Sequence, residues 1–458
     1  MDFTPTEGQS AAQQLAARIF GDLATHERLA AAGTASDAAL WKALCAAGLP
    51  AAVEEIGLLG LALVLEEQGR TTAQVPFAAT CTYGVLAVAR HGTAEQRARL
   101  LPALRDGTAV ATGAFPARGA TTATTGVATA ATGATTAATG VATAVTAVAT
   151  AAPGVITAGA SRQATVDGTG RLTGVVPVVP WLRDATHVLV PDAERALWLV
   201  RVADARVEPV ETTAPWSAGR LTLDGTRAER LGRTRAERLD GTRAERLAGT
   251  RAERLGRPRG DGSTASTDSP NSTDSTDSTD TTASPDFPAS PASTASTDSA
   301  DRRPSPYDDV LACARVAFAA LQAGVCAGAL ARTVAHTTTR EQFGRPLSTN
   351  QAVLLRAADA YMDTEAIRVT TYEAAWRHDE GLPYDGQALT AAWWASEAGR
   401  RVVHTGQHLH GGVGADLDHP VHRHFLWGRQ LDAHLGCGAE LLEELGTLLT
   451  DPPTEEAA

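Results

Sequence analysis

The last third of the chain carries the pattern that most restricts its fold. Between Tyr307 and Leu449, apolar residues recur three and four positions apart in segments of roughly 308–338, 349–379, 386–410 and 421–449. This spacing places the apolar side chains on one face of an α-helix. Glycine, proline or polar turns separate the segments, so consecutive helices fold back on one another. The sequence therefore predicts a C-terminal four-helix bundle over residues 306–450.

The first part of the chain shows a second helical pattern. The run AAQQLAARIF spaces its apolar residues three and four apart, and IGLLGLALVLEEQGR is apolar around most of its circumference, as in a helix surrounded by helices. Thr93 suits the N-cap of the run that follows it, and we expect that helix to end at Pro102 or Gly107. These runs predict an N-terminal helical domain over residues 1–108.

The middle of the chain carries strand signals. Between residues 163 and 225, Gly, Pro and Asp separate the short runs RLTGVVPVV, HVLVP, ALWLVRV and GRLTLDG. These β-branched runs predict a small antiparallel β domain. The preceding segment, 109–162, consists almost entirely of Ala, Thr, Gly and Val without a lasting period. It is interpreted as a low-complexity insertion, either flexible or built as a β layer from repeats.

A repeat and a polar segment separate the β domain from the bundle. TRAERL occurs at Thr226, Thr234, Thr242 and Thr250, and its period of eight gives a helix no constant apolar face. We interpret the repeat as the expansion of a short DNA sequence. The segment 259–305 that follows is rich in Ser, Thr, Asp and Pro and cannot form a core. Residues 226–305 are therefore predicted to be a repeat and a disordered linker.

Charge and composition exclude several classes of function. The net charge of -12 argues against nucleic-acid and anionic-membrane partners, which attract clustered positive charge. The five cysteines form neither a C-x-x-C motif nor a disulfide framework, which indicates a reducing compartment. Neither a leader nor a membrane-spanning apolar stretch is expected. The sequence thus predicts a cytoplasmic protein with a small-molecule ligand, no nucleic acid and no membrane insertion.

Two motifs in the bundle carry chemical information. The first is TREQFGRPLSTNQAV at residues 339–353, and the second is QHLHGGVG at residues 407–414, with DHP shortly after it. Taken singly, the first is typical of a helix C-cap and the second of a loop. Together, on a four-helix pattern, they resemble the C-terminal domain of acyl-CoA dehydrogenases. The resemblance implies a mostly α fold with an N-terminal helical domain, a middle β domain and a C-terminal four-helix bundle.

The resemblance also implies FAD as the cofactor. The charged pyrophosphate of a flavin dinucleotide requires an arginine and open backbone N–H groups, which Arg340, Gly411 and Gly412 can supply. Gln407 and His408 belong to the same loop, and His408 stands where the family commonly has glutamine. In the family, these groups reach FAD across a subunit interface. This arrangement implies a homo- or heterotetramer with a related subunit.

The likeness is thinner elsewhere. Phe343 is expected either to wall the cofactor or to pack in the core. LWKALCAAGLP, LALVLEEQGR and GTAEQRARLLPALRDG are similar to the family's N-terminal helices, and DGTGRLTGVVPVVPWLRDATHVLVP is similar to its β domain. Val178 and Pro180 occupy the positions at which the family usually places a Trp and a Thr or Ser against the flavin ring. The middle domain is therefore interpreted as degenerate, in a chain of the actinobacterial type.

The catalytic base of the family is missing. Oxidation of an acyl-CoA to an enoyl-CoA needs a carboxylate that removes the α-proton while the β-hydride goes to the flavin. The two positions at which the family carries this glutamate correspond to Ala314 and Gly436, so the catalytic residue is unknown. Glu440, Glu443 and Glu444 are substitute candidates, although acidic residues on such a helix usually form a solvated face.

Arg315 and a group of histidines complete the candidate residues. Arg315 stands where the family has an arginine near the active site, and is otherwise a surface charge. The histidines between His404 and His434 lack a spacing such as H-E-x-x-H, so no metal site is predicted.

Two functions follow from the resemblance. The chain is expected to be an FAD-dependent oxidoreductase that oxidises the α,β C–C bond of an acyl-CoA and passes electrons to an electron-transfer flavoprotein. The alternative is a non-catalytic structural subunit of a heteromeric acyl-CoA dehydrogenase, since some actinobacterial members pair a subunit that lacks the base with one that has it.

Overall fold

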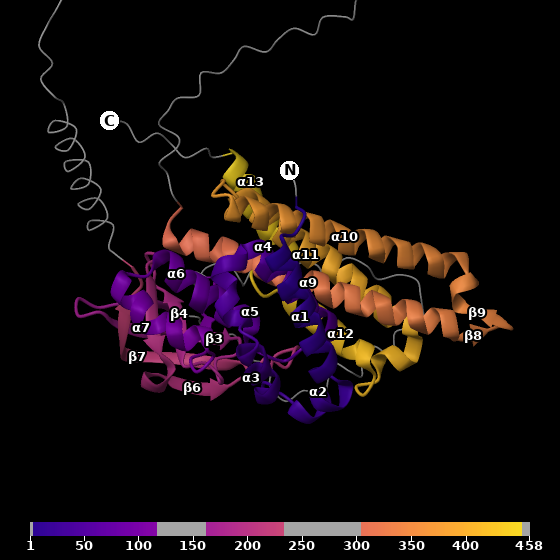
Figure 1. Ribbon diagram of the computed structural model, residues 1–458, viewed down its shortest axis with the longest axis horizontal. Helices are drawn as coiled ribbons and strands as arrows, with labels where there is room; N and C mark the ends of the chain where they lie inside the picture. Colours follow the sequence, from indigo (N-terminus) through magenta and orange to yellow (C-terminus); the bar gives the residue numbers. More distant parts are fainter. Residues whose placement is uncertain (1–2, 117–161, 233–303, 451–458) are drawn as a thin grey trace, which may run out of the picture. The chain divides into compact units, whose positions relative to one another are not determined.

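The computed structural model describes residues 3–116, 162–232 and 304–450. Figure 1 shows these residues as N-terminal helices, a β sheet and long C-terminal helices. Most of the predicted low-complexity insertion, and the predicted linker from residue 233 to residue 303, lie outside the described residues.

The N-terminal part of the chain is helical, as predicted. Its helices are α1 (Glu7–Leu23), α2 (His26–Ala32), α3 (Ala38–Ala46), α4 (Leu49–Thr71), α5 (Phe77–Ala79), the π-helix η1 (Thr80–Leu86), α6 (Ala87–His91) and α7 (Ala94–Arg105). Thr93 caps α7, since its hydroxyl accepts a hydrogen bond from the backbone N–H of Gln96, and the helix ends at Arg105 with Pro102 inside it. Pro50 lies in the first turn of α4, where proline needs no N–H partner.

Helix α4 is the central element of the N-terminal part. Its residues from Leu58 to Leu65 are almost completely buried, because α1, α3 and the C-terminal helices surround it. The helix is interrupted at Gly57, whose φ of 70° is left-handed. Asp379, from the C-terminal part, accepts hydrogen bonds of 2.7 and 2.9 Å from the N–H groups of Leu58 and Leu59. The interruption thus creates a second helix start that a distant carboxylate caps.

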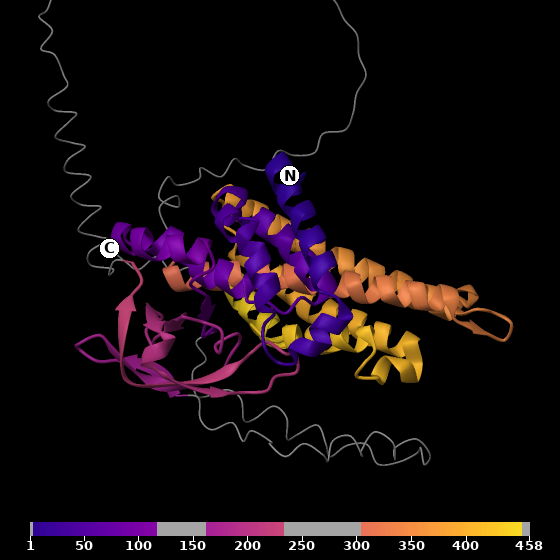
Figure 2. The ribbon, with the colours of Figure 1, turned by 60° about the horizontal axis from the view of Figure 1, so that its bottom comes forward.

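The β sheet combines strands from both sides of the insertion. Its strands are β1 (Ala111–Gly113), β2 (Arg162–Val166), β3 (Arg171–Val179), β4 (His187–Pro191), β5 (Leu197–Arg201), β6 (Arg206–Pro209) and β7 (Gly219–Arg230). The order is β1-β4-β5-β7-β3-β2, and β6 also pairs with β7. Only β1 with β4 is a parallel pair among these named strands, and Figure 2 shows the strands as a curved layer beside the helices.

Two predicted boundaries of the β domain differ from the structure. Strand β1 lies inside the segment that was assigned to the insertion, because Ala111 to Gly113 is buried and pairs with β4. Strand β7 continues to Arg230, so the first TRAERL copy belongs to the sheet and not to the linker. In an extended conformation, Thr226 lies opposite Leu172, and Leu231 reaches the core with 3% exposure. This copy of the repeat is extended because it pairs with neighbouring strands of the sheet, and the repeat sequence alone does not specify that pairing.

The C-terminal part is built from long helices. They are α9 (Pro306–Thr339), α10 (Gln351–Asp379), α11 (Asp385–His410), α12 (Pro420–Asp432) and α13 (Gly438–Thr450), with the short hairpin β8 (Glu341–Gln342) and β9 (Arg345–Pro346) between α9 and α10. The first three predicted segments match α9, α10 and α11. The fourth prediction was wrong in one respect, because the chain turns between α12 and α13 at Gly436, whose φ is 120°.

Helix α9 differs from the sequence-based expectation about apolar stretches. It is long and apolar enough to cross a bilayer, with a mean hydropathy of 1.8 in its most apolar window. Of that window, 94% is buried inside the protein, where α4, α10, α11 and α12 contact it. Its apolar character therefore reflects a core position between the N-terminal and C-terminal helices.

Candidate functional site

The two sequence motifs lie at one end of the bundle. Arg340 ends α9, with its backbone N–H bonded to the carbonyl of His336 at 2.8 Å, and the hairpin β8–β9 follows it beyond the long helices (Figure 1). The glycine loop, η5 (Gly411–Ala415), follows α11. The ring of His336 stacks on that of His410, with 4.4 Å between the centroids. Packing of α9 on α11 thus brings the Arg340 turn and the glycine loop together.

Both motifs expose the groups that a charged ligand requires. Gly411 has a φ of 64°, and a Cβ atom at Gly411 or Gly412 would meet nothing within 4 Å. No side chain therefore blocks the approach of an anion to this backbone, although the N–H of Gly411 itself donates to the carbonyl of His408. Arg340 and His408 are exposed, and Phe343 is 100% exposed with a φ of 55°. Phe343 consequently does not pack in the core of this chain.

The remaining residue of the predicted loop set lies differently. Gln407 is half-buried, and its side-chain Oε1 atom is buried without a hydrogen-bond partner among the described residues. A buried amide oxygen costs free energy unless a donor reaches it. Gln407 is therefore oriented into the protein, and the exposed groups of the loop are the two glycines and His408.

The segments around the two predicted base positions contact each other. Ala314 is completely buried on α9, and Phe318, one turn later, packs edge-to-face on His434 with 4.4 Å between ring centroids. His434 precedes Gly436 by two residues in the turn between α12 and α13. Ala314 and Gly436 thus lie close in sequence to the two rings of this contact, and neither residue provides a group that can accept a proton.

The substitute candidates have structural partners. Glu440 accepts a hydrogen bond of 3.1 Å from the N–H of Cys437, which caps the start of α13. Glu444 does not simply face solvent, because its carboxylate accepts two hydrogen bonds, of 2.8 and 2.6 Å, from Arg315. The Arg315 side chain is only 7% exposed, so it is not a surface charge. These contacts favour structural roles for Arg315, Glu440 and Glu444.

An aromatic cluster fills the space between the sheet and α9. Trp181 and Trp216 are almost fully buried and stack with 4.7 Å between centroids. Both lie 6.3 Å from the ring of Phe318 on α9. Trp216 also contacts Trp427 of α12 edge-to-face at 5.7 Å. These rings tie the middle domain to the C-terminal helices.

Sequence reasoning missed this aromatic cluster. It assigned the flavin-facing wall to Val178, which is 39% exposed, and to Pro180, whose carbonyl accepts a hydrogen bond of 2.6 Å from Thr112. The available signal was a pair of Pro-Trp dipeptides, at Trp181 and Trp216, in a chain that has only eight tryptophans. Their meeting depends on two loops 35 positions apart, which no local pattern encodes.

The cluster is not an ordinary apolar core. The indole N–H groups of Trp181, Trp216 and Trp427 and the hydroxyl of Tyr83 are buried without hydrogen-bond partners among the described residues. Each unmet buried polar group costs about 1–3 kcal/mol. Buried polar groups without partners are rare in native proteins, so a group of them at one place indicates a requirement other than core packing, such as a functional one.

These residues allow a test of the fit to FAD. The pyrophosphate end fits, because Arg340 offers an exposed charge-assisted donor and no side chain obstructs the backbone at Gly411 and Gly412; of these two, the N–H of Gly411 already donates to the carbonyl of His408. The ring end does not fit within this chain's own sheet, because stacked indoles and Phe318 fill the space there. The chain therefore has residues for one end of the cofactor only.

Family profiles match both helical parts of the chain. The acyl-CoA dehydrogenase C-terminal domain matches residues 308–439, and the acyl-CoA dehydrogenase N-terminal domain matches residues 6–108. Acyl-CoA dehydrogenase FadE27 of Mycobacterium tuberculosis is 44% identical over 142 residues, which make up 29% of this chain and 38% of that protein. Acyl-CoA dehydrogenase FadE28 of the same organism is 33% identical over 27% of this chain and 36% of its own length. The alignments thus span well under half of these curated relatives.

Solved structures match over almost the whole chain. A variant of the Tcur3481-Tcur3483 steroid ACAD superposes with a TM-score of 0.69 and 33% identity, covering 97% of this chain and 98% of that chain. The ChsE4-ChsE5 complex from Mycobacterium tuberculosis gives a TM-score of 0.70 and 26% identity, covering 99% and 100%. Butyryl-CoA dehydrogenase from Megasphaera elsdenii shares the fold, with a TM-score of 0.67 and 18% identity over 98% and 100%. The predicted resemblance and fold class are confirmed, and the chain belongs to the acyl-CoA dehydrogenase family.

Proposed function

We propose that this chain is the base-free subunit of a heteromeric acyl-CoA dehydrogenase. In this proposal, the Arg340 turn and the Gly411–Gly412 loop of this chain bind the pyrophosphate of an FAD, and a related subunit binds the flavin ring of the same FAD. The observation that carries the proposal is the division of the site: the pyrophosphate groups are open, whereas the ring position is filled by Trp181, Trp216 and Phe318. The assembled enzyme would act in the cytoplasm.

The missing base supports this reading. Oxidation of the α,β bond requires a carboxylate within reach of the α-proton, and Ala314 and Gly436 offer none. Glu440 and Glu444 already serve as a helix cap and as the partner of Arg315. Bound FAD supplies the hydride acceptor, and an electron-transfer flavoprotein is the expected recipient of its electrons. The proton acceptor would come from the related subunit.

An exposed apolar stripe on α10 supports assembly with another subunit. Leu355, Met362 and Val369 recur every seven residues and are 57%, 61% and 54% exposed. Leu354 and Tyr361 widen the stripe, with 54% and 58% exposure. A seven-residue repeat of apolar side chains is the pattern with which one helix packs along another. Two similar solved structures are named for two chains each, Tcur3481-Tcur3483 and ChsE4-ChsE5.

The proposal is tested by comparing the chain alone with the chain co-expressed with a candidate related subunit. Alone, the chain should bind flavin substoichiometrically and reduce no dye with a panel of acyl-CoA substrates. The co-purified complex should be active and contain stoichiometric FAD. In the complex, Arg340→Ala should release flavin, whereas Arg345→Ala, an exposed arginine of the same hairpin, should retain it.

The second candidate is an oxidoreductase that works without a partner of different sequence. The unmet indole N–H groups of Trp181 and Trp216 favour it, since a ligand with acceptor atoms could satisfy them after the rings rearrange. A homotetramer with full flavin content and acyl-CoA-dependent dye reduction would establish this candidate and refute the heteromeric one.

A further inference from the structure

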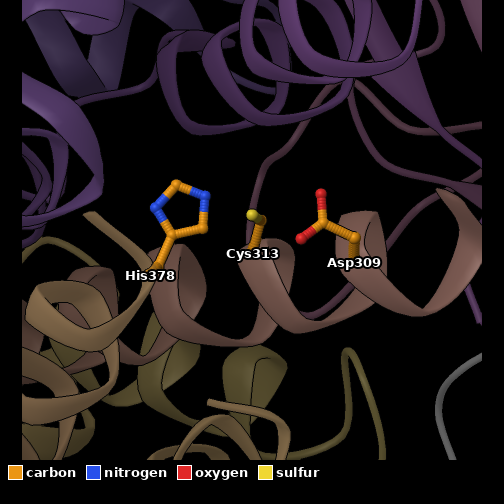
Figure 3. A group of neighbouring side chains, drawn as sticks. All are labelled: Asp309, Cys313 and His378. Atoms are coloured by element: carbon orange, nitrogen blue, oxygen red, sulfur yellow. The ribbon is translucent and has the colours of Figure 1, made fainter. Parts of the chain in front are cut away.

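A buried polar cluster lies away from the flavin motifs and was not found by sequence reasoning. Asp309 and Cys313 are one turn apart on α9, and His378 lies at the end of α10. One potential ligand atom from each residue lies within 4.8 Å of the other two, and all three residues are buried. Figure 3 shows the three side chains pointing in the same direction, with one ring nitrogen of His378 toward the Cys313 sulfur.

The orientation of His378 is fixed by a second carboxylate. Its Nδ1 atom lies 2.9 Å from Oδ1 of Asp379, which is itself held by the backbone N–H groups of Leu58 and Leu59. In the neutral imidazole, donation from Nδ1–H to this carboxylate leaves the lone pair on Nε2, and a cation would take the place of the proton that Nε2 carries in the imidazolium form. Nε2 is buried without a hydrogen-bond partner among the described residues, and the side chain is only 5% exposed. A carboxylate behind a histidine is the arrangement that orients metal-binding imidazoles.

The hydroxyl of Tyr384 also contacts the cluster. The hydroxyl of Tyr384 lies 2.9 Å from Oδ1 of Asp309, 3.2 Å from the Asp309 carbonyl and 3.2 Å from the Cys313 sulfur. A hydroxyl has one proton, so it can satisfy only one of these acceptors at a time. Each oxygen of the Asp309 carboxylate thus has two hydrogen-bond contacts, so a cation on Oδ1 has to take over the position of the Tyr384 hydroxyl.

The other side of the carboxylate is occupied by positive groups. Arg90 donates hydrogen bonds of 2.9 and 3.1 Å to Asp309, and Nε2 of His91 lies 2.7 Å from the same carboxylate. These contacts hold Asp309 in place, and the Tyr384 hydroxyl occupies the side of the carboxylate toward Cys313. With Cys313 as thiolate, a divalent cation and Arg90 would balance the thiolate and the carboxylates of Asp309 and Asp379. Such neutrality matters because unbalanced buried charge is costly.

We propose that Asp309, Cys313 and His378 form a structural binding site for one zinc-like divalent cation. Zinc prefers thiolate, imidazole and carboxylate ligands in tetrahedral geometry. Bonds of the usual length place such ligand atoms ~3.3–3.8 Å apart, so ligand atoms that now lie within 4.8 Å of one another would move closer on binding. The Tyr384 hydroxyl or a water is the fourth ligand. The ion would tie α9 and α10 to the N-terminal helices through Asp379 and Arg90.

The test uses the full chain, freed of metal with a chelator and titrated with Co²⁺. A cobalt–thiolate bond gives a charge-transfer band in the near ultraviolet, which imidazole and carboxylate ligands do not give. The background is Cys45→Ser with Cys437→Ser, because these two thiols are partly exposed. The titration should give the band at one equivalent, and Zn²⁺ should abolish it by competition. A second readout is the melting temperature, which saturating Zn²⁺ should raise.

Two variants in this background identify the ligands. Cys313→Ala and His378→Gln should lose the band and the zinc-dependent rise in melting temperature, with affinity at least a hundredfold lower. Cys326→Ala should keep both, because Cys326 is an equally buried thiol of the same helix outside the cluster. Binding without a thiolate band, or a band unchanged in Cys313→Ala, would overturn the proposal. If Cys313→Ala does not fold, two other results would overturn the proposal. One is a thiolate band that disappears in Cys326→Ala, and the other is the absence of the band from the parent chain.

Discussion

The guanidinium of Arg315 donates two hydrogen bonds to the carboxylate of Glu444, which joins α9 to α13. The arginine is almost fully buried, while the glutamate is 50% exposed. A two-point contact between a planar guanidinium and a carboxylate is directional as well as favourable. Arg315 therefore fixes the last helix on the bundle.

Glu444→Gln should lower the free energy of unfolding by about 1–2 kcal/mol, because the buried guanidinium loses its charged partner while solvent at the exposed end limits the loss. Urea unfolding measures the difference. Glu443→Gln, on an exposed position of the same helix, is the matched control and should stay within about 0.5 kcal/mol of the parent chain. Equal effects of the two substitutions would show that the contact does not stabilise the fold.

Gly57→Ala should lower the free energy of unfolding by about 2–4 kcal/mol. The residue has a φ of 70°, and an added Cβ atom would lie 2.5 Å from a carboxylate oxygen of Asp379. That carboxylate would have to leave the N–H groups of Leu58 and Leu59. The control is Gly8→Ala in α1, where nothing lies within 4 Å and a small gain is expected. The measurement is thermal unfolding. Equal melting temperatures for Gly57→Ala and Gly8→Ala would contradict the contact between Gly57 and Asp379.

The stability of the protein should fall on acidification because of His424. Complete burial, with a smaller contribution from Arg332, lowers the pKa of His424 to about 4 from 6.5. Between these two pKa values, His424 is protonated in the unfolded chain but neutral in the folded chain. Its contribution to the free energy of unfolding is therefore complete above pH 6.5 and is lost as the pH falls toward 4. The loss attributable to this group is on the order of 3 kcal/mol.

The measurement for His424 is urea unfolding between pH 7.5 and pH 4.5. His424→Gln should be less stable at neutral pH, since its contacts with the carbonyls of Pro420 and Arg70 are weakened, but should lose less stability on acidification. His408→Gln, which removes an exposed imidazole, should keep the parent's pH profile. Parallel profiles for His424→Gln and the parent would locate the acid sensitivity in other groups.

Restoring a glutamate at a family base position should not create activity in this chain alone. Ala314→Glu would place a carboxylate at a completely buried position, and Gly436→Glu would force a side chain onto a φ of 120°. The first is costly because a buried carboxylate lacks compensating charge, and the second because the backbone is left-handed there. Dye reduction with acyl-CoA substrates, alongside circular dichroism, separates absent activity from lost folding. Turnover by a folded variant would show that a functional flavin site exists within the single chain.

Local patterns predicted the helices well, because each depends on residues close in sequence. The apolar spacing located α9, α10 and α11 within a few residues, and Thr93 was correctly assigned as a cap. The break at Gly436 was missed, because the apolar spacing continues through it into α13. The TRAERL copy at Thr226 was missed as a strand, because its partners β3 and β5 are distant in sequence.

The sequence by itself determined the helical periodicity, the family motifs and the absence of a glutamate at Ala314 and Gly436, because these are properties of residue order. Only the tertiary structure decided which residues meet. It stacked Trp181 on Trp216, paired Arg315 with Glu444, and placed His378 beside Cys313 from 65 positions away. Such contacts arise when several helices and a sheet bury their apolar faces together, so they depend on the packing of the whole chain rather than on any local stretch.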